Sequence, residues 1–169
     1  MGENTFTELQ LEKDLRRTLQ IISSSWKRQD NSSDDESNFI YRMNSLEECF
    51  SEIQRTKVNK DYALHRWYNY KTSTTCEKIF CEYGAVHEKN RLNHDVDIYI
   101  DGIPFDVKLT VYPKSLSKNI YDLSTRVGKD GMIQWYYSNQ SQENRKQILN
   151  RLYVVCDATS YNESLLMKC

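Results

Sequence analysis

The dipeptide Asp101-Gly102 places the strongest constraint on how this chain folds. It lies in the segment DVDIYIDGIPFDVKLTV (95–111), between two runs in which apolar and polar residues alternate. Asp-Gly is a strong signal for a two-residue hairpin loop, because both positions of a type I′ turn need a positive φ. We therefore expect two antiparallel strands joined at this dipeptide, with Ile100 opposite Ile103.

The alternation divides the expected hairpin into two faces, because successive strand side chains point to opposite sides of a sheet. Counting outward from the turn, Asp97 faces Asp106 on the charged side, and Asp95 faces Lys108. The opposite face is predicted to be core and is wholly apolar: Val96, Ile98, Ile100, Ile103, Phe105, Val107, Leu109 and Val111.

Two carboxylates that face each other across a strand pair repel, so Asp97 and Asp106 call for a compensating positive charge. Mg²⁺ is the natural candidate, because it binds through one or two carboxylates and keeps several waters. Lys108 lies on the same face, where it can orient or deprotonate a water or stabilise a developing negative charge. The alternative is a solvated strand face with an ordinary ion pair between Asp95 and Lys108.

This pattern resembles the motif of the PD-(D/E)xK nuclease superfamily, which has the restriction-endonuclease-like fold. In that family an acid on one strand is followed, after a variable gap, by (D/E)-x-K on the neighbouring strand. Asp97 corresponds to the first acid, and Asp106-Val107-Lys108 to the second part. No proline precedes Asp97, and Asp95 competes with it as the first acid. The likeness covers roughly residues 70–157.

The resemblance implies metal-dependent hydrolysis of phosphodiester bonds, with Mg²⁺ as the cofactor and Mn²⁺ able to substitute. The family often places a further glutamate on the helix before the first strand, and Glu77 matches that position, with Glu82 and Glu88 as alternatives. Lys108 would position the attacking water or support the transition state. The implied metal ligands are Asp97, Asp106, Glu77 and the carbonyl of Val107.

The predicted order of elements is helices, a strand pair, helices and a last strand, which indicates an α/β (α+β) fold. We expect residues 61–169 to form a restriction-endonuclease-like mixed sheet flanked by helices, and residues 1–60 to form an N-terminal helical extension. A loop is predicted over 28–37, a short strand over 39–43 and a central strand over 152–156. Helices are predicted over 6–26, 46–56, 60–71, 74–83, 114–123, 132–137 and 141–149.

The distribution of charge is more informative than the net charge of −1. Residues 107–151 carry 3 acids and 8 bases, so the segment that follows the motif is basic. Basic side chains there suit contacts with phosphates, which position a nucleic acid without reading its sequence. The candidates for these contacts are Lys114, Lys118, Arg126, Arg145 and Lys146.

Other features narrow the class of protein. There is no run of about 18 apolar residues, so we expect no membrane span. The 5 scattered cysteines form no CxxC pair, which favours reduced thiols in a cytoplasmic protein over a zinc site. The aromatic segment HRWYNYK (65–71) is expected to be core rather than a surface on which bases stack.

The sequence thus predicts a nuclease, with DNA as the expected substrate, acting in restriction, defence against mobile elements or repair. Residues 1–60 are open to a role in a homodimer or in binding a partner protein. One alternative is a catalytically inactive domain of the same fold that binds nucleic acid or a partner protein. Another is an unrelated α+β interaction domain whose acidic hairpin is a solvated edge.

Overall fold

The computed structural model describes residues 2–23, 30–117, 120–140 and 150–169. The chain divides into two compact units. The first contains the residues up to Cys76 together with Leu165–Cys169, and the second is Glu77–Ser164. The division falls within one long helix, α4 (Lys60–Glu82), so each unit is described separately.

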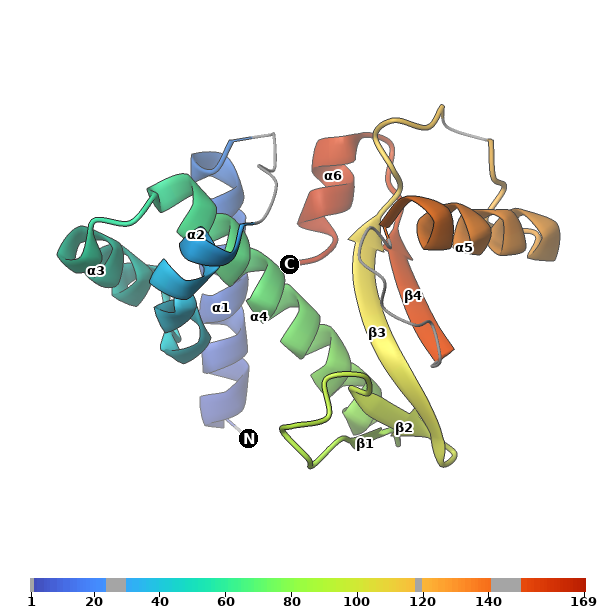
Figure 1. Cartoon of the computed structure of the whole chain (residues 1–169), viewed down its shortest axis with the longest axis horizontal. Helices are drawn as coiled ribbons and strands as arrows, with labels where there is room; N and C mark the ends of the chain where they lie inside the picture. The colour runs from blue at the N-terminus through green and yellow to red at the C-terminus, as the bar shows by residue number, and fades with distance from the viewer. Residues whose placement is uncertain (1, 24–29, 118–119, 141–149) are drawn as a thin grey trace. The chain divides into compact units, whose positions relative to one another are not determined.

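The first unit is helical (Figure 1). The α3 helix begins where Ser45-x-x-Glu48 predicts, because the Glu48 N–H donates to Ser45 Oγ over 3.2 Å and the Asn44 N–H donates to the Glu48 carboxylate over 2.7 Å. In chain order, the unit contains α1 (Gly2–Ile21), α2 (Asn31–Glu36), the 3₁₀ helix η1 (Asn38–Arg42) and α3 (Leu46–Thr56). The part of α4 up to Cys76 follows.

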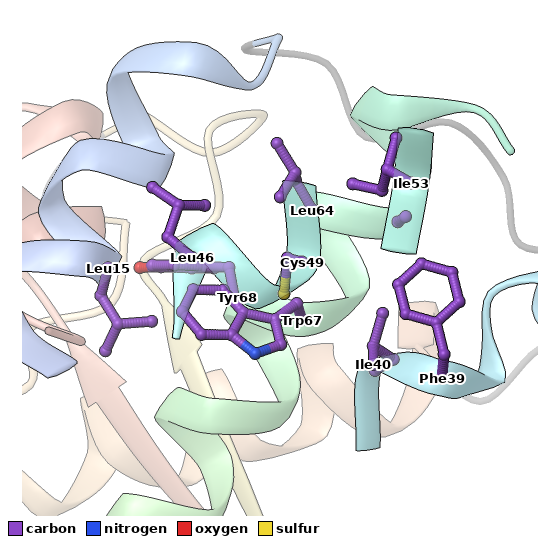
Figure 2. Close-up of a cluster of buried hydrophobic side chains, with 10 residues drawn as sticks. Leu15, Phe39, Ile40, Leu46, Cys49, Ile53, Leu64, Trp67 and Tyr68 are labelled. Carbon is purple, nitrogen blue, oxygen red and sulfur yellow. The ribbon is translucent and has the colours of Figure 1, made fainter. Parts of the chain in front are cut away.

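Trp67 of α4 lies in the core of the first unit (Figure 2). Its side chain is fully buried against residues that include Leu15, Ile40 and Leu46, and its indole N–H donates to the Met43 carbonyl over 3.1 Å. The indole therefore has its hydrogen-bond partner, as buried tryptophans generally require. The prediction that the aromatic residues of 65–71 are mostly core is confirmed at Trp67 and Tyr68.

Three local predictions for the first unit are wrong. The polar segment 28–37 contains α2, whose first turn is capped by Asp30 through a 2.8 Å bond from the Ser33 N–H. The predicted strand 39–43 is instead η1, in which Phe39 and Ile40 are buried among helices. The two helices predicted over 60–71 and 74–83 are one helix, α4.

The second unit contains a four-stranded mixed sheet in the order β1-β2-β3-β4. The pairs β1–β2 and β2–β3 are antiparallel, and β4 runs parallel to β3. This arrangement confirms the α+β class. Its elements are β1 (Val86–His87), β2 (Ile98–Ile100), β3 (Ile103–Val111), α5 (Arg126–Gln140), β4 (Asn150–Cys156) and α6 (Tyr161–Leu166).

The β2–β3 hairpin has the predicted turn and register. Asp101 and Gly102 have φ of 50° and 78°, as a type I′ turn requires. Ile100 pairs with Ile103, and Ile98 pairs with Phe105. The local sequence therefore determines where this hairpin turns and which residues face each other near the turn.

The α5 helix lies beside the sheet (Figure 1). It packs on the face that carries the even-numbered residues of β3, because its core contacts include Tyr153 and Val155, the partners of Lys108 and Thr110. Buried Tyr136 stacks on Tyr153 of β4 with ring centroids 4.9 Å apart, and Tyr112, which follows β3, joins the same core. The face predicted to be charged is thus partly core. On the face predicted to be core, Ile103 near the turn is 50% exposed.

The remaining helix and strand predictions of the second unit have mixed outcomes. The helix over 132–137 is confirmed as part of the longer α5, and the last strand as β4, although β4 lies at the edge of the described sheet. The helix over 114–123 is wrong for its described residues. The helix over 141–149 lies outside the described residues. In the described part of the chain, every helix is too short or too polar to cross a membrane.

Candidate active site

Charged side chains from α4, from the residue before β2 and from β3 gather on the second unit. The motif residues Asp106 and Lys108 belong to β3, and Asp97 immediately precedes β2. Glu77 reaches the group from α4. Electrostatic effects between Glu77, Asp97, Asp106 and Lys108 indicate that these predicted site residues lie together.

Asp97 occupies a β-bulge. Its N–H donates to the Phe105 carbonyl over 2.9 Å, although Phe105 is already the partner of Ile98 in the ladder. Two consecutive residues facing one is the pattern of a β-bulge, which bends a strand and redirects a side chain. The predicted register therefore holds at Ile98 but is interrupted at Asp97.

The bulge fixes the carboxylate of Asp97 against the neighbouring strand. Asp97 Oδ2 accepts a 2.7 Å hydrogen bond from the Val107 N–H, the middle residue of the D-x-K motif. A carboxylate held by a backbone N–H has little freedom to rotate, so the side chain is positioned before any ligand binds. The resemblance implies that the Val107 carbonyl ligates a metal, whereas the contact that the structure shows between Val107 and the site is this hydrogen bond from its N–H.

Asp106 lies between two cations. Lys108 Nζ is 2.8 Å from Asp106 Oδ1, and Arg151 Nε is 3.1 Å from Asp106 Oδ2. The side chains of Asp106 and Arg151 are 14% and 13% exposed, and that of Lys108 is 38% exposed. Each oxygen of this partly buried carboxylate therefore has its own positive partner. Lys108 thus pairs with Asp106 and not with Asp95, which is exposed in the loop before β2.

Sequence reasoning did not find Arg151. The parallel pairing of β3 with β4 sets Arg151 beside Asp106, so both side chains project from the same face of the sheet. The one signal in the sequence is a basic residue immediately before the apolar run LYVVC (152–156). Using it requires the register of two strands that are far apart in the chain.

Of the three candidate glutamates, Glu77 is the one whose pKa responds to the charge of Asp97. Its side chain is 13% exposed, and its Oε2 lies 3.3 Å from His87 Nε2 of β1. Glu82 is more than half exposed and lies 3.7 Å from Lys78. His87, like Arg151, was not predicted from the sequence.

Glu88 has a structural role in the loop before β2. Its carboxylate accepts hydrogen bonds from the Asn90 N–H, the Asn93 amide and the Tyr99 hydroxyl, each 2.7–2.8 Å long. These donors lower the pKa of Glu88 to about 2, led by the Asn90 N–H. Glu88 is thus committed to holding the loop.

The pKa values of Asp97 and Glu77 shift in the opposite direction. Burial raises the pKa of Asp97, and the Asp106 carboxylate adds to this effect, while the Val107 N–H and Lys108 oppose it. Burial also raises the pKa of Glu77, and the charge of Asp97 adds to the effect. Burial first, and then the charge of a neighbouring carboxylate, penalise the ionised forms of Asp97 and Glu77, so a positive charge added beside them would be favourable.

The chemistry of the donors fits Mg²⁺ or Mn²⁺ in part. Asp97 and Asp106 provide hard oxygen ligands, and magnesium sites in proteins often use only one or two carboxylates. The mutual repulsion that helps to raise the pKa of Asp97 is what a bound cation would relieve. Within the described residues, however, no three His, Cys, Asp or Glu side chains form a ready-made metal cluster.

The predicted phosphate-binding residues are only partly described. Lys114 Nζ lies 5.4 Å from the centre of the Tyr161 ring. Arg126, at the start of α5, has a side chain that is 95% exposed, with its Nε 3.9 Å from Asp130. Lys118, Arg145 and Lys146 lie outside the described residues.

Comparisons of the chain with protein-family models, with curated proteins and with solved structures give no match.

Proposed function

We propose that this chain is a metal-dependent nuclease of the PD-(D/E)xK type, which hydrolyses phosphodiester bonds, with DNA as the expected substrate. The observation that carries the proposal is the convergence of Glu77, Asp97, Asp106 and Lys108, with raised pKa values at Glu77 and Asp97. Two acids and a lysine in this arrangement combine metal ligands with a group that can act on water or phosphate.

The order of elements also supports a restriction-endonuclease-like fold as part of this proposal. The motif implies a helix, two strands, a helix and a further strand. The elements α4, β2, β3, α5 and β4 follow in that order, with the short strand β1 added before β2.

In this function Asp97 and Asp106 would hold the divalent cation, with Glu77 near it. The cation, when bound, would polarise the phosphate and acidify a water. The Val107 N–H keeps Asp97 in position through its 2.7 Å hydrogen bond. Lys108, whose side chain is 38% exposed, can donate to the attacking water or to a phosphate oxygen.

The direct test is cleavage of labelled DNA and RNA, double- and single-stranded, with Mg²⁺, Mn²⁺ or a chelator. We expect metal-dependent cleavage by the wild type, and losses on the order of 10²–10³-fold in Asp106→Ala and in Lys108→Ala. Asp95→Ala is the matched control, because it removes an exposed acid two residues from Asp97. Cleavage at the wild-type rate by both site variants would refute the assignment.

A non-catalytic nucleic-acid-binding domain is the second candidate. The observation that favours it is the pairing of both Asp106 oxygens with cations, which makes Asp106 resemble a structural ion-pair residue. Calorimetry distinguishes the two functions. Nucleic-acid binding without any heat of Mg²⁺ or Mn²⁺ binding would support this second function and contradict the first.

A further inference from the structure

Arg151 is a partly buried cation that the nuclease motif does not include. Its side chain is 13% exposed, and its Nε lies 3.1 Å from Asp106 Oδ2. Lys108 already supplies a positive charge to the other oxygen of Asp106. A second partly buried cation on one carboxylate needs a reason, because burying a charge is costly.

Two further elements of the fold hold Arg151 in place. The β3–β4 pairing sets its backbone beside that of Asp106. The Cζ of the guanidinium lies 6.0 Å from the centre of the Tyr137 ring of α5, within the range of a cation–π contact. Arg151 also lowers the pKa of Tyr153 against the raising effect of burial. Strand register and aromatic contacts therefore fix this side chain at the edge of the site.

A divalent cation and Arg151 would compete for Asp106. If Asp106 Oδ2 turns to a metal, the guanidinium loses its carboxylate and faces a like charge. A partly buried guanidinium without an anion is strongly unfavourable. A phosphate oxygen would restore its pairing, and the planar fork of arginine donors suits phosphate particularly well.

We propose that Arg151 is a phosphate-binding residue of the site, which Asp106 holds in place until a divalent cation takes that carboxylate. The inference rests on the proposed nuclease function and adds a residue to it. It makes two predictions of opposite sign for one substitution. Without Arg151, metal should bind more tightly and nucleic acid more weakly.

The first measurement is a calorimetric titration with Mn²⁺ in the absence of nucleic acid. Arg151→Gln should bind Mn²⁺ roughly tenfold more tightly than the wild type, because a positive charge beside the cation is removed. Asp106→Ala should lose this binding. Arg151→Met is a second variant, since an apolar side chain of similar length can pack against Tyr137 and Tyr153, and melting curves verify folding of each variant.

The second measurement is the fluorescence anisotropy of a labelled phosphorothioate DNA duplex with saturating Mn²⁺. Arg151→Gln should bind it roughly tenfold more weakly, and the slope of log affinity against log salt should fall by about one, as for the loss of one phosphate contact. Arg151→Lys should recover part of this affinity. A residue with a merely structural role would not change the salt slope.

The outcomes separate this inference from the proposed function. Unchanged or weaker Mn²⁺ binding in both Arg151→Gln and Arg151→Met, beside normal binding in the wild type, overturns the role of Arg151 and leaves the nuclease proposal standing. An unchanged salt slope in these variants overturns it as well. If the wild type binds no Mn²⁺, the nuclease proposal and the role of Arg151 both fail.

Discussion

Two clusters of buried charge, one in each unit of the chain, differ in how they are balanced. In the first unit, the side chain of Arg66 is 7% exposed and its Nε lies 3.1 Å from Asp34 Oδ1. Its guanidinium also donates to the Asp34 carbonyl and to Ser37 Oγ over 2.6 and 2.7 Å. Every nitrogen of this arginine has a partner, counting the bonds to Asn38 and Tyr41.

The cluster of the second unit is unbalanced. Among the described residues, three acids gather there with two bases. The acids are Glu77, Asp97 and Asp106, and the bases are Lys108 and Arg151. Burial and mutual repulsion raise the pKa of Glu77 and of Asp97. A balanced cluster stabilises a fold, whereas an unbalanced one costs stability and indicates a site that expects a ligand.

The largest expected effect is loss of the balanced cluster. Arg66→Met should lower the free energy of unfolding by about 2–4 kcal/mol, because it leaves Asp34 and several hydrogen-bond acceptors without their partner. The side chain of Asp34 is 32% exposed, so solvent keeps the loss below that of a fully buried pair. Urea denaturation followed by tryptophan fluorescence measures the change.

Arg151→Met is the matched variant in the unbalanced cluster. Asp106 keeps Lys108 as its partner, so the free energy of unfolding should change by less than about 1 kcal/mol. Equal losses in Arg66→Met and Arg151→Met would show that the two clusters do not differ in the way proposed here.

A second pair of variants should change the melting temperature in opposite directions in the two clusters. Asp97→Asn keeps an oxygen to accept the Val107 N–H but removes a repelling charge, so we expect the melting temperature to rise by about 2–4 °C. Asp34→Asn should lower it by about the same amount, because Arg66 loses its carboxylate. Thermal denaturation at neutral pH measures both. A fall in both variants would contradict the view that Asp97 is under electrostatic strain.

The smallest effect concerns Glu77 and depends on pH. In the folded chain its pKa lies above the ordinary value of 4.5, so the folded state holds this proton more tightly than the unfolded state does. Stability should therefore fall as the pH rises from 4.5 through the raised pKa. Glu77→Gln has no such loss, and its melting temperature should exceed that of the wild type by about 1–2 °C at neutral pH.

The same comparison at low pH is the control. Below pH 4.5, Glu77 is protonated in both states, and the difference between Glu77→Gln and the wild type should disappear. A difference that stays constant from acid to neutral pH would assign the effect to packing rather than to the charge of Glu77.

The sequence predicts the hairpin well because its signals are local. Asp101-Gly102 determines the turn, and alternation then determines the pairs from Ile100 to Ile98. Ser45-x-x-Glu48 likewise marks the start of α3. The similar pattern at Thr74 is misleading, because nothing nearby breaks α4 and the Thr74 hydroxyl bonds back to a carbonyl of its own helix.

The site is only half predictable for a related reason. Asp97, Asp106 and Lys108 lie within one hairpin, so their spacing reveals them. Arg151 belongs to β4, which begins 39 residues after β3 ends, and it lies beside Asp106 only because β4 pairs in parallel with β3. Local sequence patterns carry no information on the register of such distant strands. The bulge at Asp97 was also not predicted, because no residue near Asp97 is of a type that requires this backbone conformation.

The hydrogen bond between the Val107 N–H and Asp97 makes one backbone amide a built-in reporter of the site. The amide resonance of Val107 should shift when the Asp97 carboxylate takes up a proton or a cation, because the charge of its acceptor changes. In ¹⁵N-labelled protein, titration with acid and then with Mg²⁺ would follow both events at a single peak. The state of the site thereby becomes observable without a substrate and without any substitution.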